Sequence, residues 1–349
     1  MRYLPVGTVD ARRSQAVYHA VARCMRSGSA PTLITVSPAT PYVCVGYHQI
    51  ASREIDRKYC EQRAVPVGRR MVGGGAVYLD HDQIFWHLVL PGNYRVDDLY
   101  RRFLRAPVEA YRRIGIPAEH RPVNDIVVGS RKIGGTGAAS IGDATVLVGS
   151  IMMDFDTGEM ARVLRVPSEK FRDKMVASLS EYMTTVRREL GERAPSREEA
   201  TKGLVDAFAD LLGEPVREDR LSNCEEEETE RFAQRLFDPE FVYQDEGWLQ
   251  PGLKIREGVR LYEGVHKTPG GLLRVIFRER EGAFDDVMIS GDFFVAPPDG
   301  LRQLARSLVG QPANEDVWLR QVEEGLRKLE MPGVGPDDFG AAFRAAHSA

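Results

Sequence analysis

Apolar and small residues recur at every third or fourth position in several stretches of the chain, and this spacing is typical of helices with one buried face. The first such stretch covers residues 11–26, in which Ser14 is a candidate N-cap. Similar spacing, or a high content of charged residues, predicts four further helices, at 53–63, 97–114, 197–212 and 222–237. Each would bury its apolar face against another element.

Shorter apolar runs that end at glycine or proline predict strands. We expect residues 33–36 and 42–45 to form paired strands joined by a proline-rich turn. Further strands are expected at 65–67 and 84–90, and a strand pair at 145–154. Strands that are interleaved with helices predict an α/β or α+β fold, in which helices pack on a sheet.

Some residues with reactive or polar side chains lie inside these elements, and we expect structural roles for them. His19 lies in the first helix, where a lone histidine is more often a packing residue than a ligand. Cys44 lies in the middle of a strand, so a buried and inert thiol is expected. Trp86 and His87 are neighbours in the strand over 84–90, and we assign both to the hydrophobic core.

The composition changes near Pro239, which suggests a second unit. Alternating strands separated by glycine turns are followed by two predicted helices, at 299–308 and 315–329. This order is typical of a compact α+β module of roughly 100 residues. We therefore predict two domains, at 1–238 and 239–349.

Three consecutive glycines, Gly73 to Gly75, follow Arg69 and Arg70. Glycine loses more conformational freedom on folding than other residues, so such a run needs a compensating role. Without side chains, the backbone N–H groups can converge on phosphate oxygens, and the arginines add positive charge. The pattern is not a P-loop, because no Gly-Lys-Ser/Thr follows. A glycine hairpin between two strands, with surface arginines, is the alternative.

A second glycine cluster lies about 60 residues further along the chain. After Asn124 and Asp125, a strand, a turn at Gly129-Ser130 and then Lys132 lead into the small-residue segment Gly134-Gly135-Thr136-Gly137. Small residues beside a lysine leave room for a ligand against the backbone. The ammonium group can there meet phosphate and carboxylate charge together.

These two segments, R-R-x-x-G-G-G-A-V-x-x-D and N-D-x-x-V-x-x-x-K-I-x-G, resemble the lipoate–protein ligase family in order and separation. The resemblance implies a mixed-sheet catalytic domain of the biotin and lipoate ligase type. The later stretches G-V-H-K-x-P-G-G and S-G-D-F-F are similar to the accessory domain that many of these ligases carry at the C-terminus.

Members of this family activate lipoate with ATP and Mg²⁺ as lipoyl-AMP, release pyrophosphate, and then acylate a lysine of a lipoyl-carrier domain. The resemblance implies that Lys132 is catalytic and that Asp125 holds Mg²⁺. The residues that would contact ATP or lipoyl-AMP are Arg70, Gly73, Gly74, Gly75, Ala76, Val77, Tyr78, Asp125 and Lys132. The expected acceptor is an E2 domain, a glycine-cleavage H protein or a specialised lipoate-binding protein.

The chain also departs from the family pattern, and other functions remain open. Leu79 stands where the family has histidine, and whether His81 substitutes for it is open. Octanoyl transfer between carrier proteins is the nearest alternative, but its cysteine-dependent form is disfavoured because residues 115–131 contain no cysteine. A non-catalytic lipoyl-binding regulatory protein is a further alternative. Biotin attachment would need a Gly-Arg-rich motif that we do not find.

Composition narrows the class of protein further. The 349 residues carry a formal net charge of −4, so no general attraction to nucleic acid or anionic lipid is expected. No C-x-x-C pair occurs among the four cysteines, which are Cys24, Cys44, Cys60 and Cys224. Their spacing argues against a zinc site or a disulfide framework. The sequence lacks a signal-like N-terminus and any apolar run near 20 residues. We therefore predict a cytoplasmic protein without nucleic-acid or membrane partners.

Overall fold

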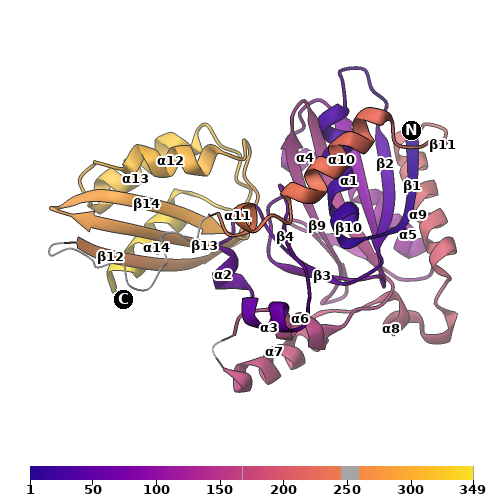
Figure 1. The fold of residues 1–349 in the computed structure, drawn as a ribbon, viewed down its shortest axis with the longest axis horizontal. Coiled ribbons are helices and arrows are strands. Elements are labelled where there is room, and N and C mark those ends of the chain that lie inside the picture. The colour runs from indigo at the N-terminus through magenta and orange to yellow at the C-terminus, as the bar shows by residue number, and fades with distance from the viewer. Residues whose placement is uncertain (167, 245–258, 349) are drawn as a thin grey trace.

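A computed structural model describes residues 1–166, 168–244 and 259–348, and its largest element is an eight-stranded mixed sheet (Figure 1). The strands lie in the order β11 (Arg217–Glu218), β1 (Arg2–Val9), β2 (Thr32–Pro38), β6 (Gln83–Pro91), β10 (Ala144–Met152), β9 (Arg131–Ile141), β8 (Asp125–Val128) and β7 (Glu119–Arg121). The strand β1 pairs in parallel with β11 and β2, and the other neighbours pair antiparallel.

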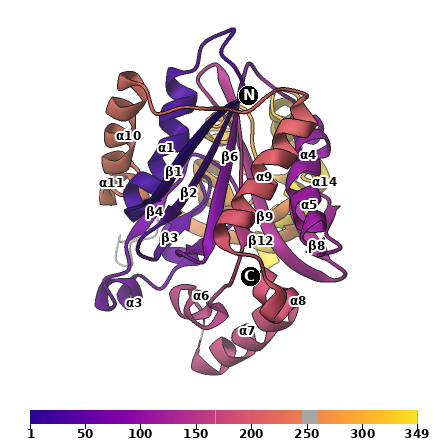
Figure 2. The same ribbon diagram turned by 90° about the vertical axis from the view of Figure 1, so that its right-hand side faces the viewer.

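Helices cover both faces of this sheet (Figure 2). One face carries α1 (Ala11–Cys24) and α10 (Asn223–Arg235), and the other carries α4 (Val96–Phe103), α5 (Arg105–Arg113) and α9 (Arg197–Leu212). Side chains of β6 point alternately to the two faces, as the period of a strand requires. Phe85 and Val89 belong to the core beneath α1, whereas Trp86 and Leu88 belong to the core beneath α9.

A separate small sheet has the order β4 (Val67–Arg69), β3 (Tyr42–Val45) and β5 (Val77–Leu79). The expected pairing of 33–36 with 42–45 is therefore wrong. Both edges of β2 are already occupied, by β1 and β6, so β3 has no free edge to join. Around the small sheet lie α2 (Ala51–Glu54), α3 (Arg57–Gln62), α6 (Thr157–Val163) and α11 (Pro239–Val242), and α7 (Glu169–Tyr182) packs on α6. The helix α8 (Val186–Leu190), which the short 3₁₀ turn η1 (Gly191–Arg193) follows, packs instead on the core beneath α9.

Several element boundaries differ from the sequence-based expectations. Asp10, and not Ser14, caps α1 through its side chain. The predicted helix at 97–114 breaks into α4 and α5, because Pro107 lacks the N–H that would bond to the carbonyl of Phe103. The helix at 53–63 is likewise two short helices, since Asp56 begins a new one as its N-cap. Residues 145–154 form one strand, β10, and not a pair.

The C-terminal part has its own three-stranded sheet and its own hydrophobic core (Figure 1). The elements are β12 (Val259–Thr268), β13 (Gly271–Arg280), β14 (Ala283–Gly291), α12 (Gly300–Leu308), α13 (Glu315–Leu326) and α14 (Pro336–Ser348), the last of which was not expected. We propose two domains on this ground. Val242 packs with Val43 and Val45 of the small sheet, which favours a boundary slightly beyond the predicted residue 238.

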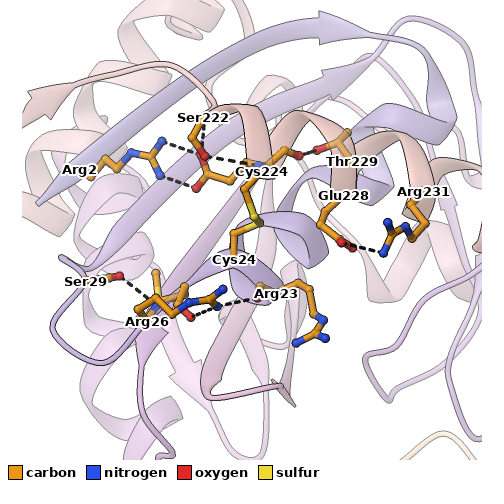
Figure 3. The surroundings of a disulfide bond; sticks show 12 residues. Arg2, Arg23, Cys24, Arg26, Ser29, Ser222, Cys224, Glu228, Thr229 and Arg231 are labelled. Carbon is orange, nitrogen blue, oxygen red and sulfur yellow. Dashed lines mark hydrogen bonds and ion pairs between the residues drawn. A yellow bond between two sulfur atoms is a disulfide. The ribbon is translucent and has the colours of Figure 1, made fainter.

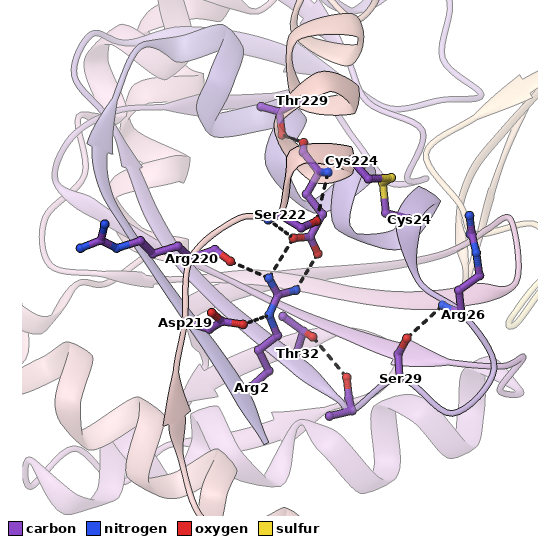
Figure 4. Close-up of polar contacts among 12 residues, drawn as sticks. Arg2, Cys24, Arg26, Ser29, Thr32, Asp219, Arg220, Ser222, Cys224 and Thr229 are labelled. Atoms are coloured by element: carbon purple, nitrogen blue, oxygen red, sulfur yellow. Dashed lines mark hydrogen bonds and ion pairs between the residues drawn. A yellow bond between two sulfur atoms is a disulfide. The ribbon is translucent and has the colours of Figure 1, made fainter.

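A disulfide joins Cys24, at the end of α1, to Cys224, in the first turn of α10 (Figure 3). The expectation that the cysteines do not pair is therefore wrong. The two residues are 200 positions apart, so their spacing held no signal, and only the packing of α10 along α1 brings them together. Beside the disulfide, Arg2 bonds to Asp219 and Glu225 and further ties β1 to this region (Figure 4).

A membrane-spanning helix has to be both long and apolar. Across residues 1–166, 168–244 and 259–348, no helix is both long and apolar enough to cross a bilayer.

Candidate active site

A cavity of about 380 Å³ lies between the large sheet, the small sheet and α7. Gly73, Gly74 and Gly75 line it from the first glycine segment, and Lys132, Gly135, Thr136 and Gly137 from the second. The two segments therefore share one hollow. Of the other residues predicted to contact nucleotide, Arg70, Ala76, Val77 and Tyr78 also line it, whereas Asp125 does not.

The first glycine segment is a shaped loop and not a hairpin. The strands β4 and β5, which flank it, lie on opposite sides of β3. Arg70 is 9% exposed, and its guanidinium donates to the carbonyl oxygens of Gly73 and Gly75, at 2.8 Å each, and of Cys44, at 3.1 Å. The alternative of a hairpin with surface arginines is thus wrong. The phosphate contact of Arg70 remains a prediction.

Close packing against other glycines also fixes the loop. Gly74 has φ of +92°, which favours glycine, and a Cβ added at Gly46 would lie 1.8 Å from the Gly74 carbonyl oxygen. A Cβ at Gly137 would lie 2.7 Å from Val72 Cγ1. Beneath the loop, the fully buried Arg69 donates to the carbonyls of Gly46, Tyr47, Gln49, Phe241 and Val242. Backbone groups of the loop are thereby held in place before any ligand arrives.

Lys132 and Asp125 form the charged end of the cavity. Lys132 Nζ lies 2.7 Å from Asp125 Oδ1. Asp125 Oδ2 accepts hydrogen bonds from Arg121 Nη2 at 2.9 Å and from the Tyr182 hydroxyl at 3.1 Å. Burial alone would raise the pKa of Asp125, but Lys132, Arg121 and Tyr182 outweigh it and hold the pKa below its ordinary value. Asp125 is therefore a carboxylate at neutral pH.

Asp125 meets the requirements of a magnesium ligand, although it does not itself line the cavity. Mg²⁺ is commonly bound by one or two carboxylates together with substrate phosphates and water. Asp125 supplies one ionised carboxylate next to the cavity lysine. Within the described ranges, no cluster of three or more His, Cys, Asp or Glu residues could hold a metal by itself. The residues fit a site that is completed by phosphate oxygens.

Small residues in β9 give the lysine its room. A Cβ added at Gly135 would lie 3.1 Å from Lys132 Nζ, which is tighter than ordinary contact. The Thr136 hydroxyl donates to the carbonyl of Asn124 at 2.7 Å, and the Asn124 amide donates to the carbonyl of Thr136 at 2.6 Å. The two predicted motif halves, before and after the turn, are thus bonded to each other.

The closed end of the cavity consists of Gln15, Tyr18 and His87, with the apolar Phe85 and Val148 beside them. The assignment of His87 to the core is wrong in part, because it is 5% exposed and yet lines the cavity. Strand alternation could have shown this, since it places Phe85 and His87 on one face and Trp86 on the other. Burial, with a smaller contribution from His19, lowers the pKa of His87 to about 3.

Other residues considered from the sequence are structural. His19 donates from Nδ1 to the carbonyl of Gln15 and accepts at Nε2 from the Met71 N–H, which confirms its packing role. Leu79 lines the cavity, whereas the His81 side chain is 69% exposed and does not line it. Cys44 is fully buried, and burial raises the pKa of its thiol.

The C-terminal module reaches the same cavity, which the sequence-based analysis missed. Asp292 is one of the lining residues. The Gly74 N–H donates to the Phe293 carbonyl at 3.4 Å, and the Gly291 N–H donates to the His48 carbonyl at 3.0 Å. The S-G-D-F-F stretch resembles the family's accessory domain, and nothing in its composition predicts contact with the first glycine segment.

Comparisons with known proteins identify the family. A family model described as the lipoyl protein ligase A/B catalytic domain matches residues 10–209, which is more than half of the chain. Lipoate-protein ligase A subunit 1 of Thermoplasma acidophilum is 28% identical over 250 residues, covering 68% of this chain and 92% of that protein. Octanoyltransferase LipM of Exiguobacterium sibiricum is 27% identical over 251 residues, covering 64% and 88%.

Solved structures agree with this result. A bi-partite lipoate protein ligase from Thermoplasma acidophilum, described with its E2 lipoyl domain, has a TM-score of 0.64 at 28% identity, covering 72% of this chain and 98% of that chain. A lipoate-protein ligase A bound with ATP has a TM-score of 0.61 at 25% identity, covering 69% and 98%. LipL1 of P. falciparum, in complex with lipoate, has a TM-score of 0.71 at 16% identity, covering 95% and 96%, and shows the fold alone.

The chain belongs to the lipoyl protein ligase A/B family and is an enzyme of that family. The predicted fold class, a mixed sheet covered by helices with a C-terminal α+β module, is confirmed.

Proposed function

We propose that the chain is an ATP-dependent lipoate–protein ligase that acts through lipoyl-AMP. The observation that carries the proposal is a single cavity with glycine backbone on one wall and the Lys132 side chain on another. Support also comes from the solved ligase that is bound with ATP, at 25% identity.

The first step needs a site that brings two anions together. A lipoate carboxylate oxygen attacks the α-phosphorus of ATP, the bond to the β-phosphate oxygen breaks, and pyrophosphate leaves. Backbone N–H groups of the Gly73–Tyr78 loop would hold phosphate oxygens, and Arg70 would add positive charge. Lys132 would stand between the carboxylate and the α-phosphate, where it offsets the repulsion between them. Asp125 would hold Mg²⁺, which neutralises phosphate charge when bound.

The second step transfers the acyl group. A lysine amine of the carrier attacks the acyl carbon, the carbon–oxygen bond to AMP breaks, and the nitrogen loses a proton. Lys132 would then polarise the acyl carbonyl through its ammonium group. The described E2 lipoyl domain of the related archaeal ligase supports a lipoyl-carrier domain as the acceptor.

Octanoyl transfer between carrier proteins is the alternative, because octanoyltransferases of the LipM type are among the relatives. A cysteine route is disfavoured here. The free cysteines Cys44 and Cys60 are buried, neither lines the cavity, and burial raises the pKa of both thiols. A non-catalytic lipoyl-binding role is disfavoured because Arg70, Asp125 and Lys132 are all present.

Lipoate-dependent release of pyrophosphate tests the proposal. The full chain with ATP and Mg²⁺ should release pyrophosphate only when lipoate or octanoate is present. No release with either acid would exclude the ligase activity. Intact mass spectrometry of candidate apo-carriers, from E2, H-protein and specialised lipoate-binding classes, would then identify the acceptor through a lipoyl mass shift.

We also propose that the enzyme works in the cytoplasm, where ATP is supplied. The Cys24–Cys224 disulfide would then have to persist in a compartment that usually keeps thiols reduced. Alkylation of a cell lysate under acid quench, followed by mass spectrometry of the two cysteine peptides, would report the state of this pair in the cell.

A further inference from the structure

The closed end of the cavity holds polar groups that have no partner among the described residues. His87 is 5% exposed, and its Nδ1 is buried without a hydrogen bond. Its ring packs against Tyr18, with ring centroids 4.5 Å apart. A buried polar atom without a partner costs free energy, so native structures rarely keep one without a reason. Because His87 lines the cavity, a ligand can supply that partner.

A chain of hydrogen bonds with one direction ends at the Tyr18 hydroxyl, in the closed end of the cavity. It begins at the Tyr42 hydroxyl, which donates to Gln15 Oε1 at 3.0 Å, while the nearby Ser14 hydroxyl donates to the Ala11 carbonyl. The bond from Tyr42 fixes the amide of Gln15, whose Nε2 then donates to the Tyr18 hydroxyl oxygen at 2.8 Å. The Tyr18 oxygen is thereby an acceptor, and its own O–H remains to donate to whatever enters the cavity.

The distance between the two ends of the cavity fits a medium-length acid. Gly135, beside Lys132 Nζ, lies two residues before Gly137 on β9, and Gly137, Val148 and His87 lie opposite one another on β9, β10 and β6. Two steps along a strand and two strand spacings separate the Gly135 and His87 Cα atoms by roughly 12 Å. An acid whose carboxylate meets Lys132 would therefore place its far end near His87 and Tyr18.

The direction of the acid follows from exposure and charge. Lys132 and Tyr182 lie at the accessible end, where nucleotide and carrier can approach. The Lys132 side chain is 27% exposed and Tyr182 as a residue is 44% exposed. Tyr18, at 1% exposure, lies where only the tail of the acid can reach. The carboxylate of the acid is attracted to the Lys132 ammonium group, so the tail lies at the closed end.

We propose that Tyr18 and His87 recognise the sulfur-bearing ring of lipoate and make the enzyme select lipoate over octanoate. This inference rests on the proposed function and deepens it. The Tyr18 O–H and a His87 N–H would donate to the ring sulfurs, which are weak acceptors, and both aromatic rings would contact polarizable sulfur. The methyl end of octanoate offers no acceptor and would leave both groups unpaired.

Three acids separate the contribution of sulfur from that of shape. We would measure kcat/KM for pyrophosphate release with lipoate, with octanoate and with 5-cyclopentylpentanoate, which keeps the ring but lacks sulfur. The wild-type enzyme should prefer lipoate over both other acids by about tenfold, the upper range of single sulfur–aromatic contacts. Equal values for lipoate and the cyclopentyl acid would overturn the proposal.

Variants assign the preference to the two side chains. Tyr18→Phe and His87→Leu should each reduce the lipoate-to-octanoate ratio of kcat/KM several-fold, because only lipoate offers an acceptor to the group that is removed. Tyr94→Phe and His81→Leu, which remove the same groups away from the cavity, are the matched controls and should keep the wild-type ratio. If kcat/KM for both acids falls together, the residues are merely structural and the proposal is wrong.

Calorimetric binding of lipoate and octanoate to the full chain without ATP keeps the two proposals apart. Selective binding of lipoate without pyrophosphate release would overturn the ligase activity and preserve the tail recognition. Pyrophosphate release with equal efficiency for all three acids would preserve the ligase activity and overturn the tail recognition. If the chain binds neither acid and releases no pyrophosphate, both the ligase activity and the tail recognition are overturned.

Discussion

The two ends of the cavity differ in the chemistry of their side chains: the open end carries charged groups, and the closed end carries neutral polar groups. At the open end, Lys132 and Asp125 lie 2.7 Å apart and Arg121 lies 2.9 Å from the same carboxylate, so each charge has an opposite charge at hand. At the closed end, Tyr18 and His87 carry no charge near neutral pH, and the Tyr18 O–H and His87 Nδ1 remain able to form hydrogen bonds with a ligand. Charge suits a reaction between anions, whereas unpaired neutral groups suit discrimination between tails of similar length.

The supports of the two ends differ as well. The open end is built on β8, β9 and α7, which are close in sequence and bonded to one another. The closed end combines α1 with β6, which the sequence separates by about 60 residues. The disulfide at the end of α1 fixes that helix to α10, and so supports the closed end from outside. Variants can therefore affect one end and spare the other.

Removal of the cation at the open end should have the largest effect. Lys132→Ala should lower kcat/KM for pyrophosphate release by roughly 10²–10³-fold, because charge that develops near the α-phosphate loses its partner. Calorimetric affinity for lipoate should fall much less, since the tail contacts remain. Lys202→Ala, at an exposed position of α9, is the matched control. A Lys132→Ala enzyme with wild-type activity would mean that another group provides the charge.

Distortion of the Gly73–Tyr78 loop, which lies between the two ends of the cavity, should have the second largest effect on the reaction rate. Gly46→Ala places a Cβ 1.8 Å from the Gly74 carbonyl, so the glycine loop must move. A shift of about 1 Å in a positioning element can cost roughly 10²-fold in rate. Gly203→Ala, at a helical position where the added Cβ meets no atom within 4 Å beyond its chain neighbours and the backbone of its own helix, is the control and should keep the wild-type rate. Unchanged activity of Gly46→Ala would show that the shape of the loop is unimportant.

Opening the disulfide should weaken the closed end selectively. The double variant Cys24→Ser, Cys224→Ser should lose about 2–4 kcal/mol of unfolding free energy, as is typical when a long loop is no longer closed. Because α1 carries Gln15 and Tyr18, KM for lipoate should rise while KM for ATP changes little. Denaturant titration and steady-state kinetics check the two effects. An equal rise in both KM values would contradict the separation of the ends.

Acid should destabilise the closed end before the open end. Burial is the largest cause that lowers the pKa of His87, and of His19 stacked on Tyr18, to about 3. Stability that depends on their neutral form is complete above the unfolded value of about 6.5 and is lost as pH falls toward 3. Asp125 has a lowered pKa too, so its contribution is complete above the unfolded carboxyl value of about 3.9 and is lost only below it.

The measurable consequence is a change in slope. Between pH 6 and pH 5, each buried neutral histidine should reduce the unfolding free energy by about 1.2 kcal/mol. His87→Leu should therefore flatten the slope by about that amount, whereas Asp125→Asn should leave it unchanged in this range. Denaturant titrations at several pH values check both slopes. An unchanged slope for His87→Leu would show that the closed end is open to water and protons.

Local patterns in the sequence predict much of the fold. The period of α1, the apolar run of β6 and the turn at Gly129-Ser130 are all local signals, and the structure has these elements. The two glycine segments with Lys132 were found because glycine beside a cation has few structural uses. Pairing was harder to foresee, since β3 joins β4 and β5 only because both edges of β2 are filled.

The missed site residues depend on contacts between distant segments. His87 was assigned to the core because it lies in an apolar run, although alternation along β6 places it on the cavity face. Asp292 and Phe293 come from the C-terminal module, more than 200 residues from the loop that they contact. The pairing of Cys24 with Cys224 follows only from the packing of two helices.

A crystal structure of the full chain with lipoate and a non-hydrolysable ATP analogue tests the account most directly. We predict that the lipoate carboxylate lies within hydrogen-bonding distance of Lys132, beside phosphate oxygens held by the Gly73–Tyr78 loop, with the ring sulfurs against Tyr18 and His87. A reversed acid, with its ring at Lys132, or a nucleotide bound away from the glycine loop, would contradict the account.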